Sequence, residues 1–557
     1  MTLRAVLVGL TGALLIACAG YSVQWHYGLD GPTAGALLPL GVLGPLVLAV
    51  LVGIPLLVAF RRAWAFRGQE VATVVVLMLA ACSIPGHGLL NHFPQTLLLP
   101  SYWNYRDVSW RHNKLMSYVP HGLLVNDGEY NEKTLDYFIT GGRADKEHIL
   151  PVSDVPWHAW RTPLMNWMPL IFLCGAASIC LAMVVHRQWS HREHLRYPIA
   201  EFIRGLTDRP DGAALAPVFH RRWFWIGLSA VMGLHLINGL YEWFPAYAIQ
   251  IPQQFSFPEV LAKFPSIKLV PEAEGLTTVT FYPTVIAFAY FLSAEISLSL
   301  GLSQLVYVLA GVFLTSMGVT LATDYDTGGP MGWYRAGAYI ALGLVILYYG
   351  RRYYAEVLWS ALSFRRPRTA EPWAVWAMRG FLAAAGAMVL YMADLGLAWT
   401  VALPAVLLIF LSFLGVSRIS AETGLYFVQP GWQPLGILLG LMGGFALGPQ
   451  GIIVLALVCV VLCMDQSQAT MPYVIHALKV GDDMALRPAS IGASSIGVYV
   501  ALVALAAPVV IWANYNSGAT GESWSWWRAP AMPFTTALPE VTNLLNTDRL
   551  ADSLKLS

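Results

Sequence analysis

Trp189-Ser-His-Arg-Glu193-His-Leu-Arg-Tyr197-Pro198 is the stretch of this sequence that decides the fold. It is strongly basic and lies between two apolar runs, at 166–186 and 223–245, that are each long enough to cross a bilayer. Arg and Lys beside a hydrophobic span mark the cytoplasmic side of a membrane. The stretch therefore predicts a membrane protein and fixes the side on which this connection lies.

The composition indicates that part of this protein is surrounded by lipid. The 557 residues are 57% hydrophobic and only 12% charged, with a mean hydropathy of +0.57. A soluble protein carries about 25% charged residues. The formal net charge of +1 is uninformative in itself, but no basic domain indicates nucleic acid, which we exclude as a partner. We expect an all-α, polytopic protein whose first partner is the lipid bilayer.

Long apolar runs predict roughly 12–14 transmembrane helices, some of them re-entrant or broken. The runs lie near 5–25, 33–60, 71–93, 166–186, 223–245, 281–299, 302–322, 335–350, 374–392, 396–415, 434–448, 450–464 and 491–512. The first run ends in Ala17-Cys18-Ala19-Gly20, which resembles a lipoprotein cleavage box. We interpret it as a retained span, because a second run follows closely, with cleavage at Cys18 as the alternative.

Arginines predict the orientation. They cluster at 61–67, 187–222 and 351–368, which all fall on one side if the N-terminus is cytoplasmic. We expect a multi-pass protein of the bacterial cytoplasmic (inner) membrane. The predicted organisation comprises N-terminal transmembrane helices at 1–95, an extracytoplasmic cap loop at 96–165, a main helical bundle at 166–512 and an extracytoplasmic tail at 513–557.

Glu295 is the clearest ionisable residue within an apolar run. Ser293 and Ser297 flank it and offer hydroxyl groups. Charged groups in a span are costly and usually face a cavity or a partner, so Glu295 is a candidate for coupling or substrate contact. The alternative is a protonated carboxyl bonded to a neighbouring helix.

A second candidate is the pair Arg418 and Glu422, four residues apart on a predicted helix. The following Gly424-Leu-Tyr-Phe-Val-Gln-Pro-Gly431 indicates a break, and broken helices in transporters expose backbone groups to ions and substrates. The alternative is an ordinary turn that carries a surface ion pair.

Two further polar sets are candidate pathway residues. Ser83-Ile-Pro85-Gly86-His87-Gly88-Leu-Leu-Asn91-His92 predicts an opened helix in which His87 and Asn91 line a vestibule. The second set, His235, Asn238 and Glu242, has helical spacing and indicates a polar stripe or a network between helices. By contrast, we expect the polar residues at predicted span ends to be solvated: Asp394, Asp465, Gln466 and Gln468.

No catalytic, cofactor or metal signature is present in the sequence. It has no Walker loop, no Gly-x-Ser-x-Gly elbow, no His-Glu-x-x-His and no Cys-x-x-Cys-His motif. Its six cysteines lie in apolar runs, and Cys459 and Cys463 lack a histidine that would complete a zinc site. We therefore expect no enzyme, no cofactor and no metal site.

Four motifs together resemble a set of uncharacterised bacterial and archaeal membrane proteins. They are Trp189-x-x-x-Glu193-x-Leu195-x-Tyr197-Pro198, Val155-Pro156-Trp157-x-x-Trp160-x-x-Pro163-Leu164-x-x-Trp167, the Pro283-to-Ser299 run, and Arg418-x-x-Ala421-Glu422-x-Gly424-Leu425. That set is similar in turn to the oligopeptide transporter (OPT) superfamily through its Leu-x-Tyr-Pro stretch. The resemblance implies a secondary transporter of small peptides or metal chelates.

Two hypotheses of different classes follow. The first is a secondary transporter, coupled to protons or another ion, for a small-molecule or peptide substrate. The second is a non-transporting membrane subunit that scaffolds partner proteins through its cap and tail. Either role is compatible with a homo-oligomer or a larger membrane complex. A third reading, an intramembrane enzyme acting on lipid, finds no nucleophile–base pair in the sequence.

Overall fold

The computed structural model describes residues 2–27, 39–86, 88–143, 149–209, 213–322, 328–363, 367, 369–425, 428–519 and 528–556. Within them, nine helical segments are long and apolar enough to cross a membrane: Leu3–Val23, Leu40–Phe60, Trp157–Arg192, Arg222–Trp243, Ala294–Ser316, Pro372–Asp394, Trp399–Thr423, Pro434–Cys463 and Pro488–Ser517. The all-α, multi-pass architecture is therefore confirmed.

The helix bounds follow the chain as α1 (Leu3–Tyr27), α2 (Leu40–Leu48), α3 (Ile54–Phe60), α4 (Gly68–Ala81), α5 (Phe93–Arg106), α6 (Val108–His112), α7 (Glu132–Thr140), α8 (Trp157–Arg187), α9 (Pro198–Thr207), α10 (Arg222–Trp243), α11 (Pro258–Lys263), α12 (Pro283–Ala289), α13 (Ala294–Ser316), α14 (Gly329–Tyr349), α15 (Arg351–Ser363), α16 (Pro372–Asp394), α17 (Trp399–Thr423), α18 (Pro434–Cys463), α19 (Thr470–Asp483), α20 (Pro488–Ser517), α22 (Met532–Asn546) and α23 (Leu550–Leu556). Two π-helical turns, η2 (Ala49–Gly53) and η7 (Gln188–Arg192), continue α2 and α8. The strands β1 (Gln254–Ser256) and β2 (Thr278–Thr280) pair antiparallel.

Fewer long helices form than the apolar runs indicate, because several runs break or merge. The run at 71–93 yields only the 14-residue α4, which stops before Pro85 and Gly86. The run at 281–299 is divided between α12 and α13. The runs at 434–448 and 450–464 join as α18, although Gly443 and Gly448 inside it have φ of 77° and 67°, a left-handed conformation that interrupts the helix.

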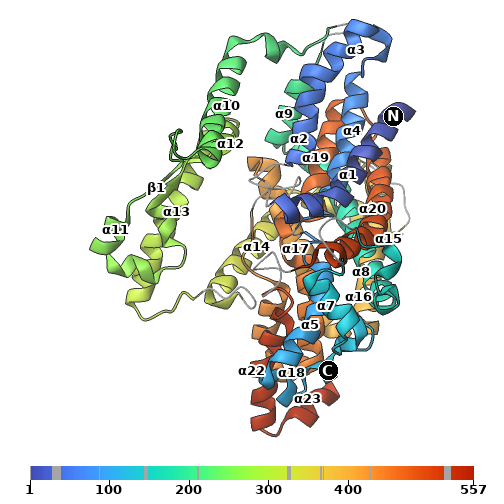
Figure 1. Cartoon of the computed structure of the whole chain (residues 1–557), viewed down its shortest axis with the longest axis vertical. Coiled ribbons are helices and arrows are strands. Elements are labelled where there is room, and N and C mark those ends of the chain that lie inside the picture. The colour runs from blue at the N-terminus through green and yellow to red at the C-terminus, as the bar shows by residue number, and fades with distance from the viewer. Residues whose placement is uncertain are drawn as a thin grey trace.

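The core of the molecule is a bundle around α8, which packs on α16, α19 and α20, while α1 packs on α4 (Figure 1). Two indole rings near the start of α8 are buried in it. Trp160 and Trp167 are fully buried, and their ring N–H groups donate to the Tyr515 hydroxyl (3.1 Å) and the Leu123 carbonyl (3.0 Å). Each ring thus buries a large apolar area while its one donor is satisfied.

The described residues between 96 and 156 form the short helices α6 and α7 and most of α5. In Figure 1 the helices α5, α22 and α23 lie together at one end of the bundle, beside the C-terminus. Trp110 of α6 and Phe534 of α22 are in ring contact at 4.8 Å between centroids, and α22 and α23 pack on α18. Residues 528–556 therefore form one packed unit with the end of the bundle.

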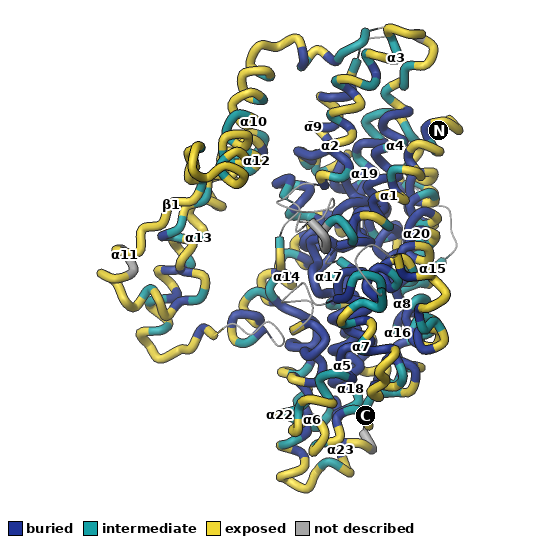
Figure 2. Tube along the Cα trace, viewed as in Figure 1, coloured by how far each residue is buried: buried dark blue, intermediate teal, exposed yellow. Residues whose placement is uncertain are grey.

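An arm made of α10 to α13 stands off the bundle (Figure 1). It is largely exposed along its length (Figure 2), and α10 has no buried residue. The turn after α12 joins it to the bundle: Arg196 donates to the Phe291 carbonyl at 2.8 Å, and Phe288 lies against Phe202 with ring centroids 6.2 Å apart. An apolar helix without protein neighbours is suited to lipid or to another protein chain.

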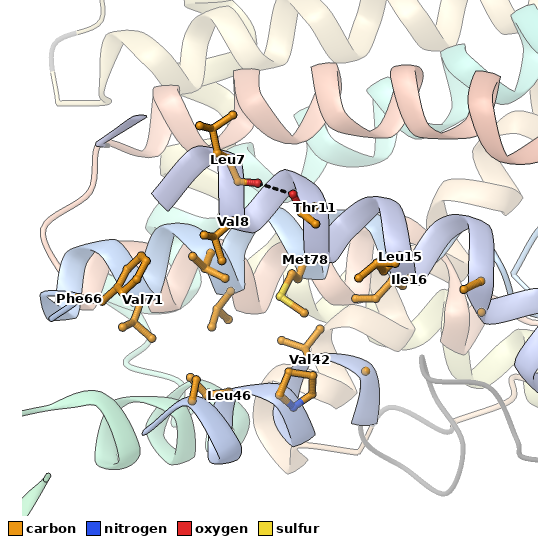
Figure 3. A pocket seen from close by; sticks show the side chains of 18 of the residues that line it. Leu7, Val8, Thr11, Leu15, Ile16, Val42, Leu46, Phe66, Val71 and Met78 are labelled. Atoms are coloured by element: carbon orange, nitrogen blue, oxygen red, sulfur yellow. Dashed lines mark hydrogen bonds between the residues drawn. The ribbon is translucent and has the colours of Figure 1, made fainter. Parts of the chain in front are cut away.

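An apolar pocket of about 640 Å³ lies between α1, α2 and α4 (Figure 3). Thr11 contributes the one polar side chain among its lining residues, and its hydroxyl donates to the Leu7 carbonyl at 2.9 Å. The pocket therefore offers a solute little besides apolar side chains and fits hydrocarbon.

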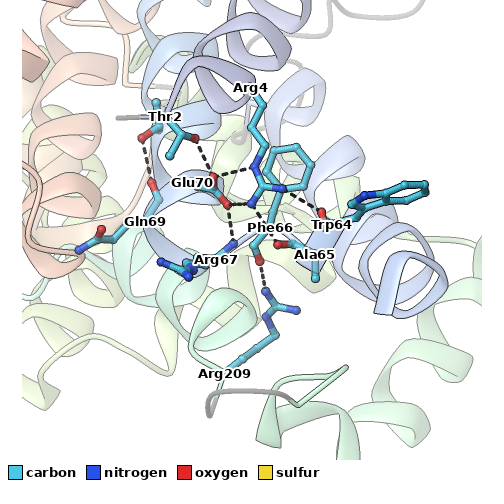
Figure 4. Close-up of polar contacts among 10 residues, drawn as sticks. Thr2, Arg4, Trp64, Ala65, Phe66, Arg67, Gln69, Glu70 and Arg209 are labelled. Carbon is cyan, nitrogen blue, oxygen red and sulfur yellow. Dashed lines mark hydrogen bonds and ion pairs between the residues drawn. The ribbon is translucent and has the colours of Figure 1, made fainter. Parts of the chain in front are cut away.

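Arg4 and Glu70 hold the N-terminal helix against the start of α4 (Figure 4). The guanidinium binds both carboxylate oxygens, at 2.8 and 2.5 Å, and the Thr2 hydroxyl donates to the same carboxylate at 2.6 Å. Hydrogen bonds from Arg4 lower the pKa of Glu70 to about 2, against a smaller opposing effect of burial. Nearby, Arg209 donates to the Phe66 carbonyl, which joins two of the arginine-rich segments.

We expect Glu70→Gln to lower the melting temperature in detergent at pH 7 by about 1–3 °C. Folding lowers the pKa of Glu70, so the ionised carboxylate stabilises the folded protein. This stabilisation is fully present above pH 4.5, the ordinary pKa of the group, and is lost as the pH falls toward about 2. The difference in melting temperature between wild type and Glu70→Gln should thus become smaller below about pH 4. Glu201→Gln is the control, because Glu201 pairs with Arg204 at 3.8 Å on an exposed surface. An equal fall in melting temperature in Glu70→Gln and Glu201→Gln would contradict a stabilising role for the Arg4–Glu70 pair.

Candidate functional site

Two interruptions of the helical backbone meet inside the bundle. One is the segment 82–92 between α4 and α5, and the other is the segment 464–469 between α18 and α19. The Ser83 and Thr470 hydroxyls lie 3.1 Å apart, and a Cβ on Gly88 would approach the Gln468 carbonyl oxygen to 2.4 Å. Only glycine allows this contact between the two backbones.

The first interruption carries a buried polar network into the bundle. Asn91, His92 and Gln95 are each 1% exposed. The Gln95 amide donates to the Tyr21 hydroxyl at 3.1 Å, and that hydroxyl donates to Asn514 Oδ1 at 2.6 Å. Side chains from α5, α1 and α20 are thereby joined, and these hydrogen bonds fix the position of the opened segment. His87 lies outside the described residues.

The second interruption buries a carboxylate. Asp465 is 4% exposed and accepts hydrogen bonds from the Ser467 backbone N–H (3.0 Å), the Ser467 hydroxyl (2.6 Å) and the Gln468 amide (3.1 Å). Among the residues that the structure describes, it has no Lys, Arg or His ion-pair partner. Neutral donors thus hold a buried acidic group that has no positively charged partner among the described residues.

This burial corrects the expectation that Asp465, Gln466 and Gln468 are solvated. They are 4%, 3% and 6% exposed, whereas Asp394 is exposed as expected. The apolar runs on both sides of these residues predict spans that end at water. In the folded chain, α18 instead runs directly into the packed interior and the short turn η11 (Gln466–Gln468) begins there.

A polar cavity of about 560 Å³ borders this turn, and we refer to it as the central cavity. Its lining comprises Glu272, Arg335, Tyr339, Gln429, Pro430, Gly431, Trp432, Gln433, Met464 and Gln466. Arg335 donates to both carboxylate oxygens of Glu272 at 2.7 Å, and Gln466 donates to the Trp432 carbonyl at 3.3 Å. The cavity thus carries one charge of each sign within reach of the buried turn.

Two buried polar atoms of residues that line the central cavity lack hydrogen-bond partners among the described residues. They are Nε1 of Trp432 and Oε1 of Gln433, whose residues are 2% and 4% exposed. A buried polar group without a partner costs about 1–3 kcal/mol. One donor and one acceptor of the cavity wall are therefore without a partner among the described residues.

A second polar cluster joins two of the sequence motifs at the end of α17. Arg418 pairs with Glu422 at 2.6 Å and with Glu193, and its guanidinium lies 5.2 Å from the centroid of the Trp189 ring. Gln188 donates to the second oxygen of Glu193 at 2.9 Å. The Arg418–Glu422 pair is thus part of a partly buried network that also holds the turn after α8.

The backbone reinforces this junction. The N–H of Tyr197, which has a left-handed φ of 47°, donates to the Ala421 carbonyl at 3.0 Å. Beneath it, the Ser420 hydroxyl and Nε2 of the fully buried His476 lie 2.9 Å apart. The basic turn is therefore fastened to α17 and α19 by both main-chain and side-chain contacts.

Glu295 lies at the very start of a candidate span and not in its middle. Its helix, α13, begins at Ala294, so Glu295 lies in the first turn and is exposed in this chain. Ser293 is the N-cap, whose hydroxyl accepts from the Ile296 N–H at 3.5 Å, and Ser297 is also exposed. A carboxylate in the first turn is favourable beside free backbone N–H groups, which accounts for its position without a cavity.

The stripe on α10 is likewise outside the bundle. His235 and Glu242 are exposed. The Asn238 side chain bonds both main-chain groups of Ile251, at 2.8 and 3.1 Å. The structure brings Ser83 and Gly88 against Thr470 and Gln468, but it separates these contacts from Glu295 and from this stripe.

The long apolar helices and buried polar turns define a multi-pass, all-α membrane protein. The chain belongs to a family of unknown function (DUF6785), whose model matches residues 1–550. This confirms the expected uncharacterised family of membrane proteins, and the match carries no link to oligopeptide transporters. No curated protein and no solved structure matches the chain.

Proposed function

We propose that this protein is a secondary transporter, coupled to protons or another cation, that binds its solute in the central cavity. One observation carries the proposal: the buried Asp465 carboxylate lies in a turn where two interrupted helices meet, next to a polar cavity. In secondary transporters, such interruptions expose backbone groups that hold ions and substrates near the middle of the bilayer. A buried acidic residue in that setting marks an ion or proton path.

The cavity suits a small polar solute. Its volume of about 560 Å³ is within the range of about 300–1,000 Å³ that is usual for small-molecule sites. Arg335 and Glu272 pair with each other in this structure, and a zwitterion would replace that pair with its own carboxylate and amine. The resemblance to oligopeptide transporters makes small peptides or metal chelates the proposed substrate class. The basic loops support a bacterial inner-membrane location with a cytoplasmic N-terminus.

Gradient-driven uptake in proteoliposomes tests this function. Purified protein would be reconstituted and supplied with pools of small peptides and of metal chelates, with a proton or sodium gradient imposed across the membrane. We expect accumulation of at least one pool that collapses when an ionophore dissipates the gradient. Absence of gradient-dependent accumulation for every pool, with protein that is folded and inserted, would contradict the proposal.

The exposed arm favours one alternative, a membrane subunit that scaffolds other proteins. Trp243 at the end of α10 is 79% exposed, and α10 has no protein neighbours that bury it. A photo-crosslinking residue at position 243 would distinguish the two functions in native membranes. A cross-link to one defined protein, together with no solute uptake in proteoliposomes, would favour the scaffold.

A further inference from the structure

His186, His191 and Asp482 form a cluster at the junction of η7 and α19. One ligand atom from each residue lies within 4.8 Å of the other two. His191 Nε2 lies 2.6 Å from Asp482 Oδ2, and His186 Nε2 lies 3.5 Å from the same oxygen. The cluster is distinct from the central cavity, which none of the three residues lines.

The backbone explains how two histidines five residues apart face one point. In a regular α-helix, residues five apart are about 140° apart around the axis. The π-helical turn Gln188–Arg192 has wider i→i+5 hydrogen bonding, which brings such residues into line. The two imidazole rings are 6.1 Å apart between centroids as a result. Isolated π-turns of this kind occur frequently at functional sites.

His186 supplies an independent indication of a missing ligand. It is 1% exposed, and neither of its ring nitrogens has a hydrogen-bond partner among the described residues. The 3.5 Å approach of Nε2 to Asp482 is an ion-pair distance without hydrogen-bond geometry. A buried imidazole without partners is costly unless another atom occupies the space between it and the carboxylate.

We propose that His186, His191 and Asp482 bind a divalent transition-metal ion of the Zn²⁺ class. Two imidazoles and one carboxylate, with one open position, form a recognised ligand set for zinc. Metal–ligand distances near 2.0–2.2 Å place tetrahedral ligand atoms about 3.4 Å apart. The separation between His186 and Asp482 already matches, and the 2.6 Å contact of the partly exposed His191 would open by rotation of its side chain.

The surrounding charges permit a cation there. Lys479 of α19 is a charged neighbour of His186, and its ammonium pairs with Asp483 at 2.8 Å. Arg187 is directed to Glu371 at 3.5 Å, and Arg192 lies over the Tyr353 ring at 4.7 Å. A bound ion would fasten η7 to α19, close to the Glu193–Arg418 pair.

Zinc titration of the purified full-length protein tests the proposal. Calorimetry with ZnCl₂ should show one binding site in the wild-type protein. The zinc affinity should fall about 100-fold or more in His191→Ala and in Asp482→Asn, because losing a metal ligand has a larger effect than losing a hydrogen bond to a ligand. Both positions are partly exposed, so these variants should fold. His158→Ala is the matched control, because His158 is exposed at the opposite end of α8, and its affinity should equal that of wild type.

A second readout separates this site from adventitious zinc. ZnCl₂ should raise the melting temperature of wild type and His158→Ala but not of His191→Ala or Asp482→Asn. No binding by wild type, or equal binding and equal stabilisation in all four proteins, would overturn the proposal. The measurements are made in detergent without a gradient, so their failure leaves the transport proposal standing, and the reverse also holds.

Discussion

Asp465→Asn should reduce gradient-driven uptake by about 100-fold or more while the protein still folds, because the change removes the one charge of the buried turn. Asparagine keeps an oxygen that can accept from the Ser467 N–H and hydroxyl, at the 3.0 and 2.6 Å distances that Asp465 now makes. The turn should therefore retain its shape and lose its capacity to hold a cation or a proton. Uptake under an imposed gradient, measured beside the melting temperature, checks both parts.

A matched control uses another aspartate at the end of an apolar helix. Asp394 terminates α16 and is exposed, so Asp394→Asn should leave uptake unchanged. Uptake by Asp465→Asn at the wild-type rate would remove this carboxylate from the mechanism. An equal loss in both variants would show that the effect is not specific to the buried turn.

Arg418→Met should be the most destabilising single change at the motif junction. Arg418 is 14% exposed and holds Glu193 and Glu422, which are 17% and 33% exposed. Removing the cation leaves two partly buried carboxylates without their partner. We expect the free energy of unfolding to fall by about 2–4 kcal/mol. This is less than the cost of breaking a completely buried pair, because these carboxylates keep some contact with solvent. The melting temperature in detergent should fall by several degrees.

A double-mutant comparison identifies the cause of that loss. Glu193→Gln combined with Arg418→Met should be more stable than Arg418→Met alone, because the repulsion between unpaired carboxylates is reduced. Arg187→Met is the control, since Arg187 and Glu371 are about 40% exposed and 3.5 Å apart, and such surface pairs contribute about 0–1 kcal/mol. If Arg418→Met lowers the free energy of unfolding no more than Arg187→Met does, the network of Arg418, Glu193 and Glu422 is not a source of stability.

The sequence was sufficient for the class of the fold because that class depends on composition and run length. Apolar runs of about 20 residues have few stable alternatives to membrane helices. The Pro85-Gly86 break was also predictable, since these residues interrupt an α-helix through backbone chemistry alone. The pairing of Arg418 with Glu422 follows from helical spacing, but its contact with Glu193 depends on how α8 and α17 pack.

The position of a polar residue relative to the interior was less predictable. Glu295 and Asp465 have similar surroundings in sequence, each a carboxylate beside apolar residues. The structure exposes Glu295 because α13 belongs to the arm and has only Val308 and Gly311 buried, and it buries Asp465 because α18 and α19 meet inside the bundle. Burial is a tertiary property, and a short run such as Asp465-Gln-Ser-Gln468 resembles a surface turn unless the packing of its neighbours is known.

Thiol labelling of Gln466→Cys tests most directly whether the central cavity is a wet path for solute. Gln466 lies in the turn beside Asp465 and lines the cavity, while the native cysteines are buried except for the half-buried Cys18. A charged, membrane-impermeant thiol reagent should label the variant from one side of the membrane, well above the wild-type background, and solute should slow the reaction. Labelling at the background level from both sides, in folded protein, would contradict a solute path through this cavity.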